Sequence, residues 1–363
     1  MLLDAERARL AQLSKDDSTL PAERLDAHKF PVLSIPIEIT SEIFIRTLPS
    51  DFSYLFTSDS PQNLLGICSQ WRAIALDTPA LWCSVAVREE RIVQRVEVVF
   101  EALRIWLARA GSLPLAFRMS VNPVRVFIDV HLASLLRDFC SRWEHLDLDI
   151  RATFDPISLL SEHAPRLREL HMSRWGIGQG DPQVDLLHAP LLDSVGLWDI
   201  PVSPTMLPWH GLTYLAILRR PLVECALALC AAPNLIYCHL DISLAASLAL
   251  DSPRIVLAAL THLILKSDDG GLDNALDSFT LPALERMYIA PHLFSTDVVA
   301  DLRRLLDRSG CKLRTLVWAG VEYLASEAEL QASLPTVDVR CQLSPFVLRL
   351  RERSWQSDEW WDA

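Results

Sequence analysis

Cysteine, histidine and acidic side chains are the residues of this 363-residue chain that could bind a metal ion or carry out catalysis. None of its eight cysteines forms a C-x-x-C pair, and most lie in apolar runs, where a thiol packs as a small hydrophobic group. This pattern predicts reduced cysteines in a cytoplasmic or nuclear protein, and no zinc site. Residues 267–274 resemble a calcium-binding loop only in part, because the terminal glutamate of that loop is missing.

The sequence motifs of common enzyme classes are also missing. The chain has no G-x-S-x-G nucleophile motif, no G-x-x-x-x-G-K-[ST] phosphate loop, and no G-x-G-x-x-G that follows a strand and begins a helix. Pairs of acidic residues are plentiful, but the sequence pattern places none of them together in a site. We therefore expect a protein that is not an enzyme and needs no cofactor.

Charge and hydropathy restrict the partners. The formal net charge is −12, and the acidic excess is present in both halves of the chain. Nucleic acids and anionic membranes are bound by basic patches, so neither is expected as a partner. No run approaches the roughly 18 apolar residues of a membrane span. Half of the residues are apolar, which is enough for a large core.

A leucine motif recurs along most of the chain and must position any binding residues. The pattern L-x-x-L-x-L, with conservative replacements, begins at nine positions: Trp143, Leu167, Leu192, Leu212, Leu235, Leu260, Leu284, Leu313 and Leu334. Successive matches lie about 20–29 residues apart, which is the spacing of leucine-rich repeats. The sequence therefore predicts an α/β solenoid with a curved parallel sheet over residues 143–345. A common α/β domain with coincidental leucines is the alternative.

Side chains alternate between the two faces of a strand, so the residues between the leucines should line the concave face. Solenoids usually bind partners there, and tyrosine and tryptophan are frequent binding hot spots. The predicted partner-binding residues are His145, Asp147, Glu169, His171, Trp198, Tyr214, Tyr237, His239, His262, Lys266, Arg286 and Tyr288. Four of them are histidines, but they lie on different predicted strands without a metal-binding spacing, so we expect no metal site.

Residues 31–85 have a different character and predict a small helical domain. Ile35, Ile39 and Ile43 recur four residues apart, as expected for one edge of an amphipathic helix, and Pro36 suits its first turn. A second helix is predicted over residues 64–75, with Trp71 on its apolar face. Either these side chains form the core of the small domain, or they form a surface that binds another protein.

Three segments of this region resemble the F-box motif: FPVLSIPIEITSEIF at 30–44, CSQWRAIA at 68–75 and TPALW at 78–82. The resemblance is closest to the fungal F-box proteins with degenerate leucine-rich repeats, and WLARAGSLPL at 106–115 is also similar to that group. Ile35 and Ile37 depart from the motif, which usually has leucine and proline at these positions. The loop between the two helices is also longer than usual.

The resemblance implies a substrate-recruiting subunit of an SCF-type cullin–RING ubiquitin ligase. The F-box would bind a Skp-type adaptor, and the repeats would bind the target protein. By motif position, the adaptor-binding residues would be Ile35, Pro36, Ile39, Ile43, Phe44 and Trp71. The alternative is a protein-interaction scaffold outside any ligase, with an F-box that is vestigial. The sequence does not identify the target protein.

The expected organisation follows from these patterns. Residues 1–30 are a flexible lead-in, 31–85 the F-box-like helical domain, and 86–142 a linker helix with the first irregular repeats. The solenoid follows over 143–345, and residues 346–363 form a C-terminal tail rich in tryptophan and acidic residues. Within 86–142, a long helix is predicted to end at Gly111, and a strand follows over 113–119.

Overall fold

The computed structural model describes most of the chain between residues 34 and 342. The described ranges are 34–49, 52–88, 95–121, 128–150, 164–173, 186, 188–243, 254–267, 275–290, 297–319 and 327–342. The predicted lead-in, the C-terminal tail and most of the calcium-like loop lie outside these ranges.

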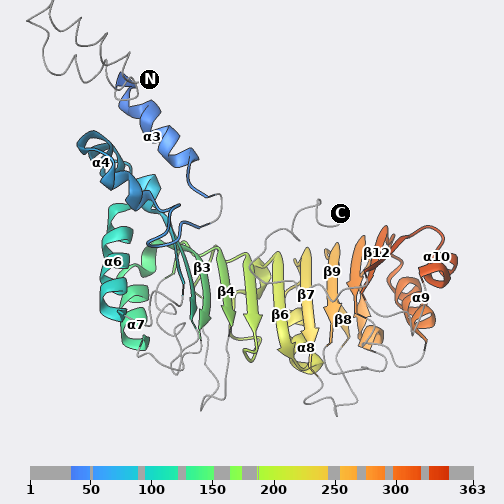
Figure 1. The fold of residues 1–363 in the computed structure, drawn as a ribbon. Helices are drawn as coiled ribbons and strands as arrows, with labels where there is room; N and C mark the ends of the chain where they lie inside the picture. The colour runs from blue at the N-terminus through green and yellow to red at the C-terminus, as the bar shows by residue number, and fades with distance from the viewer. Residues whose placement is uncertain are drawn as a thin grey trace, which may run out of the picture.

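A mixed α/β fold is built on one parallel sheet of eleven strands (Figure 1). Neighbouring strands follow chain order, except that β8 and β10 form a separate two-stranded sheet, Ile255–Val256 and Phe279–Thr280. The eleven strands are β1 Ser84–Arg88, β2 Leu115–Val121, β3 Trp143–Ile150, β4 Glu169–Ser173, β5 Ser194–Trp198, β6 Tyr214–Arg220, β7 Tyr237–Ile242, β9 His262–Lys266, β11 Arg286–Ile289, β12 Thr315–Ala319 and β13 Asp338–Gln342. Each of the nine leucine motifs therefore leads into or spans one strand.

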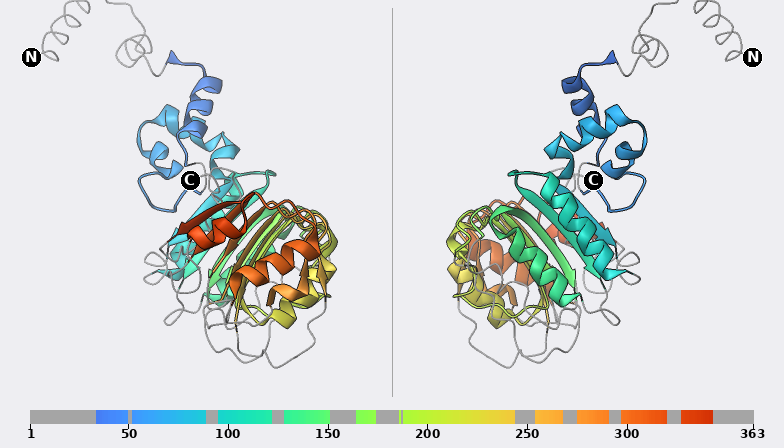
Figure 2. Two further views of the ribbon diagram at one scale, coloured as in Figure 1. Left: turned by 90° about the vertical axis from the view of Figure 1, so that its right-hand side faces the viewer. Right: turned by 90° about the vertical axis from the view of Figure 1, so that its left-hand side faces the viewer.

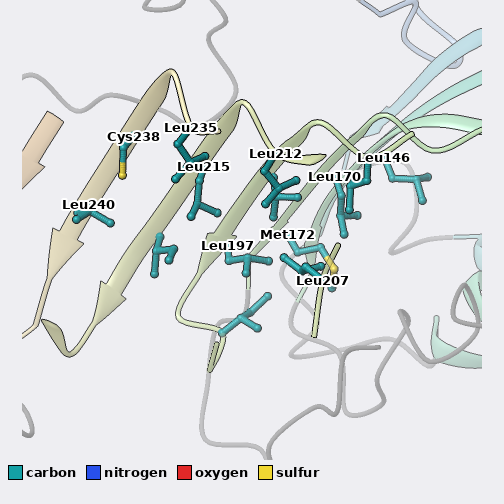
Figure 3. Packing of buried hydrophobic residues seen from close by; sticks show 14 of the residues in the cluster. Leu146, Leu170, Met172, Leu197, Leu207, Leu212, Leu215, Leu235, Cys238 and Leu240 are labelled. Carbon is teal, nitrogen blue, oxygen red and sulfur yellow. The ribbon is translucent and has the colours of Figure 1, made fainter. Parts of the chain in front are cut away.

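The motif leucines form the main hydrophobic core. In β7, Cys238 and Leu240 point to the same side as Leu215 of β6 and Leu197 of β5 (Figure 3). Leu235, at the first position of its motif, is also buried against this cluster. Because the strands pair in register, every motif places its apolar side chains beside those of its neighbours. The predicted alternation of the two strand faces is confirmed.

Helices in several of the connections between strands cover the leucine side of the sheet. They are α6 Val96–Arg109, α7 Asp129–Asp138, α8 Leu222–Ala231, α9 Val298–Ser309 and α10 Glu327–Ser333. Leu103, Leu132, Leu229 and Leu305 belong to the same cluster as the strand leucines. The sheet begins at β1, so the predicted boundary at residue 85 falls inside a strand rather than between two domains.

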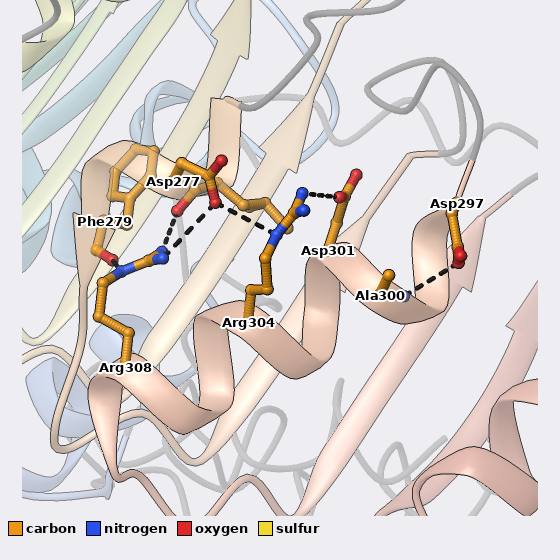
Figure 4. A network of polar contacts seen from close by, with 8 residues as sticks. Asp277, Phe279, Asp297, Ala300, Asp301, Arg304 and Arg308 are labelled. Carbon is orange, nitrogen blue, oxygen red and sulfur yellow. Dashed lines mark hydrogen bonds and ion pairs between the residues drawn. The ribbon is translucent and has the colours of Figure 1, made fainter.

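Helix α9 shows how one of these connections is held in place. The Asp297 carboxylate accepts a hydrogen bond from the Ala300 amide at 3.0 Å and caps the helix N-terminus. Arg304 and Arg308, one turn apart, both contact the Asp277 carboxylate, at 3.6 and 3.5 Å (Figure 4). Arg308 also donates to the Phe279 carbonyl at 2.8 Å. These contacts fix α9 against strand β10 and the 3-10 turn before it.

The region before β1 forms a small helical head at the N-terminal end of the sheet (Figure 2). Its elements are α3 Ile37–Arg46, the 3-10 helix Pro61–Gly66, α4 Ser69–Leu76 and the 3-10 turn Pro79–Trp82. The Trp82 indole donates to the Ala75 carbonyl at 2.8 Å and packs edge-on against Trp106 of α6, at 5.1 Å between ring centroids. Trp82 thereby joins the head to the repeat region.

The outer edge of β1 is also occupied. The Ala86 amide donates to the Ser53 carbonyl at 2.8 Å, and the Leu55 amide donates to the Ala86 carbonyl at 2.9 Å. A segment of the head therefore pairs with the first strand. An unpaired strand edge invites association with other chains, so this pairing closes that end of the sheet.

We expect Gly310→Ala to lower the free energy of unfolding by about 1–2 kcal/mol, because Gly310 ends α9 in the left-handed conformation, with φ +62°. No heavy atom lies within 4 Å of the added Cβ, so the loss would come from backbone strain alone. Urea denaturation followed by circular dichroism measures the change. The matched control is Gly66→Ala, which has equally open space without a positive φ and should cause no loss. Equal effects of the two substitutions would contradict this explanation.

Candidate functional site

The first candidate surface is an apolar stripe that consists of Ile39 and Ile43 of α3 and of Ile35, two residues before the helix begins. Ile39 is 53% exposed and Ile43 44% exposed, whereas Ile35 is partly buried. The neighbouring Ile37 and Pro36 are also exposed. Large apolar side chains left in water along one helix mark an interaction site.

Two of the predicted adaptor-binding residues do not belong to this surface. Phe44 is only 2% exposed, and its ring packs against Trp71 at 4.9 Å between centroids. Trp71 is partly buried against the main core. The prediction that Phe44 lies on the surface is therefore wrong. The helical period places Phe44 beside Thr40 on the side of α3 that meets α4.

Polar contacts hold α3 and α4 in fixed positions beneath this stripe. The Thr78 hydroxyl donates to the Ile74 carbonyl at 2.7 Å and lies 3.1 Å from the Ser41 hydroxyl of α3. The Arg72 guanidinium donates to the Leu65 carbonyl at 2.7 Å. The contact between Thr78 and Ser41 thus links α3 to the segment that follows α4.

The second candidate surface is the sheet face opposite the leucines. Strand register aligns the predicted partner-binding residues in three rows across the sheet. The first row contains His145, Glu169, Tyr214, Tyr237, His262 and Arg286. The second contains Asp147, His171, His239 and Tyr288, and the third contains Trp198 and Lys266. We call this surface the polar-aromatic face.

The β3–β4 end of the polar-aromatic face is acidic and partly neutralised. Asp147 forms an ion pair with Arg118 of β2 at 2.6 Å, and Glu169 lies 3.4 Å from the His145 ring. The Asp149 carboxylate accepts hydrogen bonds from the hydroxyls of Ser120 and Ser173. Burial and the nearby Glu169 raise the pKa of Asp193, beside this end of the face.

The middle of the polar-aromatic face is apolar and buried. Tyr214, Ala216, Ile264, Tyr288 and Val317 form a second hydrophobic cluster on this side of the sheet. Tyr237 packs against that cluster and stacks on His262, at 4.4 Å between ring centroids. Lys266 lies over the Tyr288 ring at 5.0 Å.

The burial of this face differs from what the sequence predicts. The predicted partner-binding residues are expected to line an exposed concave face, but Tyr214, His239, His262 and Tyr288 are all buried. Burial raises the pKa of Tyr214 well above its usual value and lowers the pKa of His239 well below its usual value. Nearby Lys266 adds to the effect on His239. His239 is therefore neutral near pH 7.

Two buried cysteines of the repeats, Cys225 and Cys238, are poor nucleophiles. Burial raises the pKa of the Cys225 thiol to about 12, and the pKa of Cys238 is raised as well. A thiolate, rather than a thiol, is the reactive form. Neither residue supplies a thiolate near neutral pH.

Within the described residues, no three histidine, cysteine or acidic side chains gather closely enough to hold a metal ion. Among the described helices, none is long and apolar enough to cross a membrane. No protein-family model matches the chain, and no curated protein matches it.

We expect His239→Gln to reduce the acid sensitivity of the fold. The unfolded chain takes up a proton on this histidine below about pH 6.5, whereas the folded chain resists protonation. Stability attributable to His239 is therefore complete above pH 6.5 and declines as the pH falls, by up to about 1.4 kcal/mol per pH unit. Urea denaturation between pH 7 and pH 5 measures this slope. A matched variant, His210→Gln at an exposed position, should keep the wild-type slope. An unchanged slope in His239→Gln would contradict a buried neutral histidine.

Proposed function

We propose that the chain is a substrate-recruiting subunit of an SCF-type ubiquitin ligase. The head binds a Skp-type adaptor through α3, and the sheet holds the protein to be modified. The observation that carries the proposal is the exposed apolar stripe of α3 in a segment that resembles the F-box motif.

We also infer that the sheet and its connections form a leucine-rich-repeat-like solenoid. Nine motifs at similar spacing align with nine successive parallel strands, and the residues at each motif position share the same core. Each repeat buries its leucines only against its neighbours, which is the property of a solenoid. Such an array offers one long surface for a protein partner.

The energetics of the α3 stripe support binding to an apolar groove. Burial of one large apolar side chain contributes roughly 1.5–3 kcal/mol. Ile39 and Ile43 lie one turn apart, so a single groove can cover both. Recognition of a helix by a groove uses this spacing of anchors.

The polar-aromatic face supports the second half of the proposal. Tyr237 is partly exposed near its centre, and charged residues lie on either side. Interfaces commonly combine aromatic anchors with a polar rim, and the rim determines the orientation of the partner. Both kinds of residue are placed here by rigid strands.

We expect Ile39→Asp to weaken binding to a Skp-type adaptor by at least tenfold, because the substitution loses apolar contact and places a charge at the interface. Titration of the purified full-length chain with the adaptor, by calorimetry, measures the affinity. Leu227→Asp, at a similarly exposed apolar residue on α8, should bind as the wild type does. Unchanged affinity for Ile39→Asp, with its circular dichroism spectrum preserved, would contradict the proposal.

A ubiquitin-transfer assay separates the ligase subunit from the scaffold alternative. A ligase subunit transfers ubiquitin to its bound target when the adaptor, cullin, RING protein and charged conjugating enzyme are present. A scaffold binds the same target without transfer. Transfer by the wild type and its loss in Ile39→Asp would support the ligase subunit.

A further inference from the structure

We propose that the side chain of Gln331 caps the outer edge of β13 and prevents a second copy of this chain from adding to the sheet there. Strand β13 is the last strand of the main sheet, and no described strand pairs with its outer edge. Gln331 belongs to α10, the helix that precedes this strand. The proposal rests on the hydrogen bonds of Gln331, on the direction of the backbone groups of β13 and on the charges of that strand.

The carboxamide of Gln331 forms hydrogen bonds with the backbone at and just before β13. Its Nε2 donates to the Val337 carbonyl at 2.9 Å, and its Oε1 accepts a hydrogen bond from the Val339 amide at 3.2 Å. Nε2 also donates to the Leu334 carbonyl at 3.3 Å. One side chain therefore satisfies a backbone acceptor and a backbone donor that lie two residues apart.

These two backbone groups point away from the rest of the sheet. The Asp338 amide donates to the Arg314 carbonyl at 2.7 Å, on the side of β12. Successive residues of a strand direct their backbone groups to opposite edges, so Val337 and Val339 direct theirs outward. A further parallel strand would donate to the Val337 carbonyl and accept from the Val339 amide. The Gln331 carboxamide makes the same two bonds and takes the place of that strand.

Without this cap, the edge of β13 suits pairing with a second copy of itself. In an antiparallel pair centred on Val339, the Val339 amide of each copy would donate to the Val339 carbonyl of the other. Asp338 of one copy would then lie opposite Arg340 of the other, and two-fold symmetry would repeat this contact. Within one chain these two side chains form an ion pair at 2.9 Å and stay 55% and 38% exposed. Opposite charges across two strands favour pairing, so the charges of this edge select a second copy.

The opposite end of the sheet is closed in a comparable way. The Ser53 carbonyl and the Leu55 amide pair with the outward backbone groups of Ala86 in β1. Unpaired strand edges promote association between chains, and repeat arrays need caps at both ends. The role inferred for Gln331 does not depend on adaptor binding or on ubiquitin transfer. Failure of the ligase proposal would therefore leave this inference standing.

Sedimentation velocity of the full-length chain tests the cap. The variant Gln331→Met keeps the length and the helix propensity of the side chain but loses its hydrogen bonds to the backbone. We expect it to dimerise roughly tenfold more tightly than the wild type, or tighter still. The matched control Ala332→Met places the same apolar side chain at the next, exposed position of α10 and should dimerise no more than the wild type. Equal dimerisation of the wild type and Gln331→Met would overturn the proposal.

A charge swap tests where the two copies meet. Arg340→Asp, introduced into Gln331→Met, would place two acids opposite each other and should weaken the dimer roughly tenfold. Addition of Asp338→Arg restores opposite charges across the two-fold axis and should restore the dimer. If Arg340→Asp leaves the dimer of Gln331→Met unchanged, the copies meet at another surface and the inference is wrong.

Hydrogen exchange at a dilution where Gln331→Met is monomeric measures the cap itself. The Val339 amide should exchange roughly tenfold faster in this variant, because its acceptor on Gln331 is lost. The Asp338 amide, bonded to the Arg314 carbonyl, should exchange at the wild-type rate. Equal acceleration at both amides would mean that the whole strand loosens, and would contradict a cap confined to the outer edge.

Discussion

The register between neighbouring parallel strands is the constraint on which the rest of this structure depends. A five-residue strand such as β5 buries Val195 and Leu197 on one side, but it cannot surround them by itself. The neighbouring strands bury these two side chains only if their own apolar residues occupy the paired positions. The pairing of Val195 with Leu215 and of Leu197 with Ile217 meets this condition. A shift of one residue would send all of these side chains to the opposite face.

The same register also determines what the opposite face can contain. Residues between the leucines must align in rows across the sheet, whatever their chemistry, because strand pairing fixes which residues lie side by side. Tyr214, Tyr237 and His262 therefore become neighbours although they are distant in sequence. Their proximity needs no separate stabilising contact. A repeat can thus exchange its face residues for binding while its leucines preserve the fold.

Local patterns in the sequence predicted the strands but not the burial of the polar-aromatic face. The leucine motif found nine of the eleven strands in the main sheet, and the glycines Gly111 and Gly310 both have positive φ, as helix-ending glycines do. Burial of Tyr288 depends on which atoms lie above the sheet, and no periodicity within a strand encodes that. Phe44 was misplaced for a related reason. A motif position records a residue type, whereas the packing of α3 on α4 decides which side of the helix is covered.

The head and the repeats share one core, yet their two candidate surfaces are independent. Trp82 contacts Ala75 of α4 and Trp106 of α6, so the hydrophobic cluster continues from the head into the sheet. The stripe of α3 lies outside that contact, because Thr40 and Phe44 occupy the covered side of the helix. The polar-aromatic face lies on the side of the sheet opposite the shared core. Since neither surface contributes to the shared core, a partner can bind one of them without loosening the support of the other. The shared core therefore fixes the position of the α3 stripe relative to the polar-aromatic face, which a flexible linker between two domains would not do.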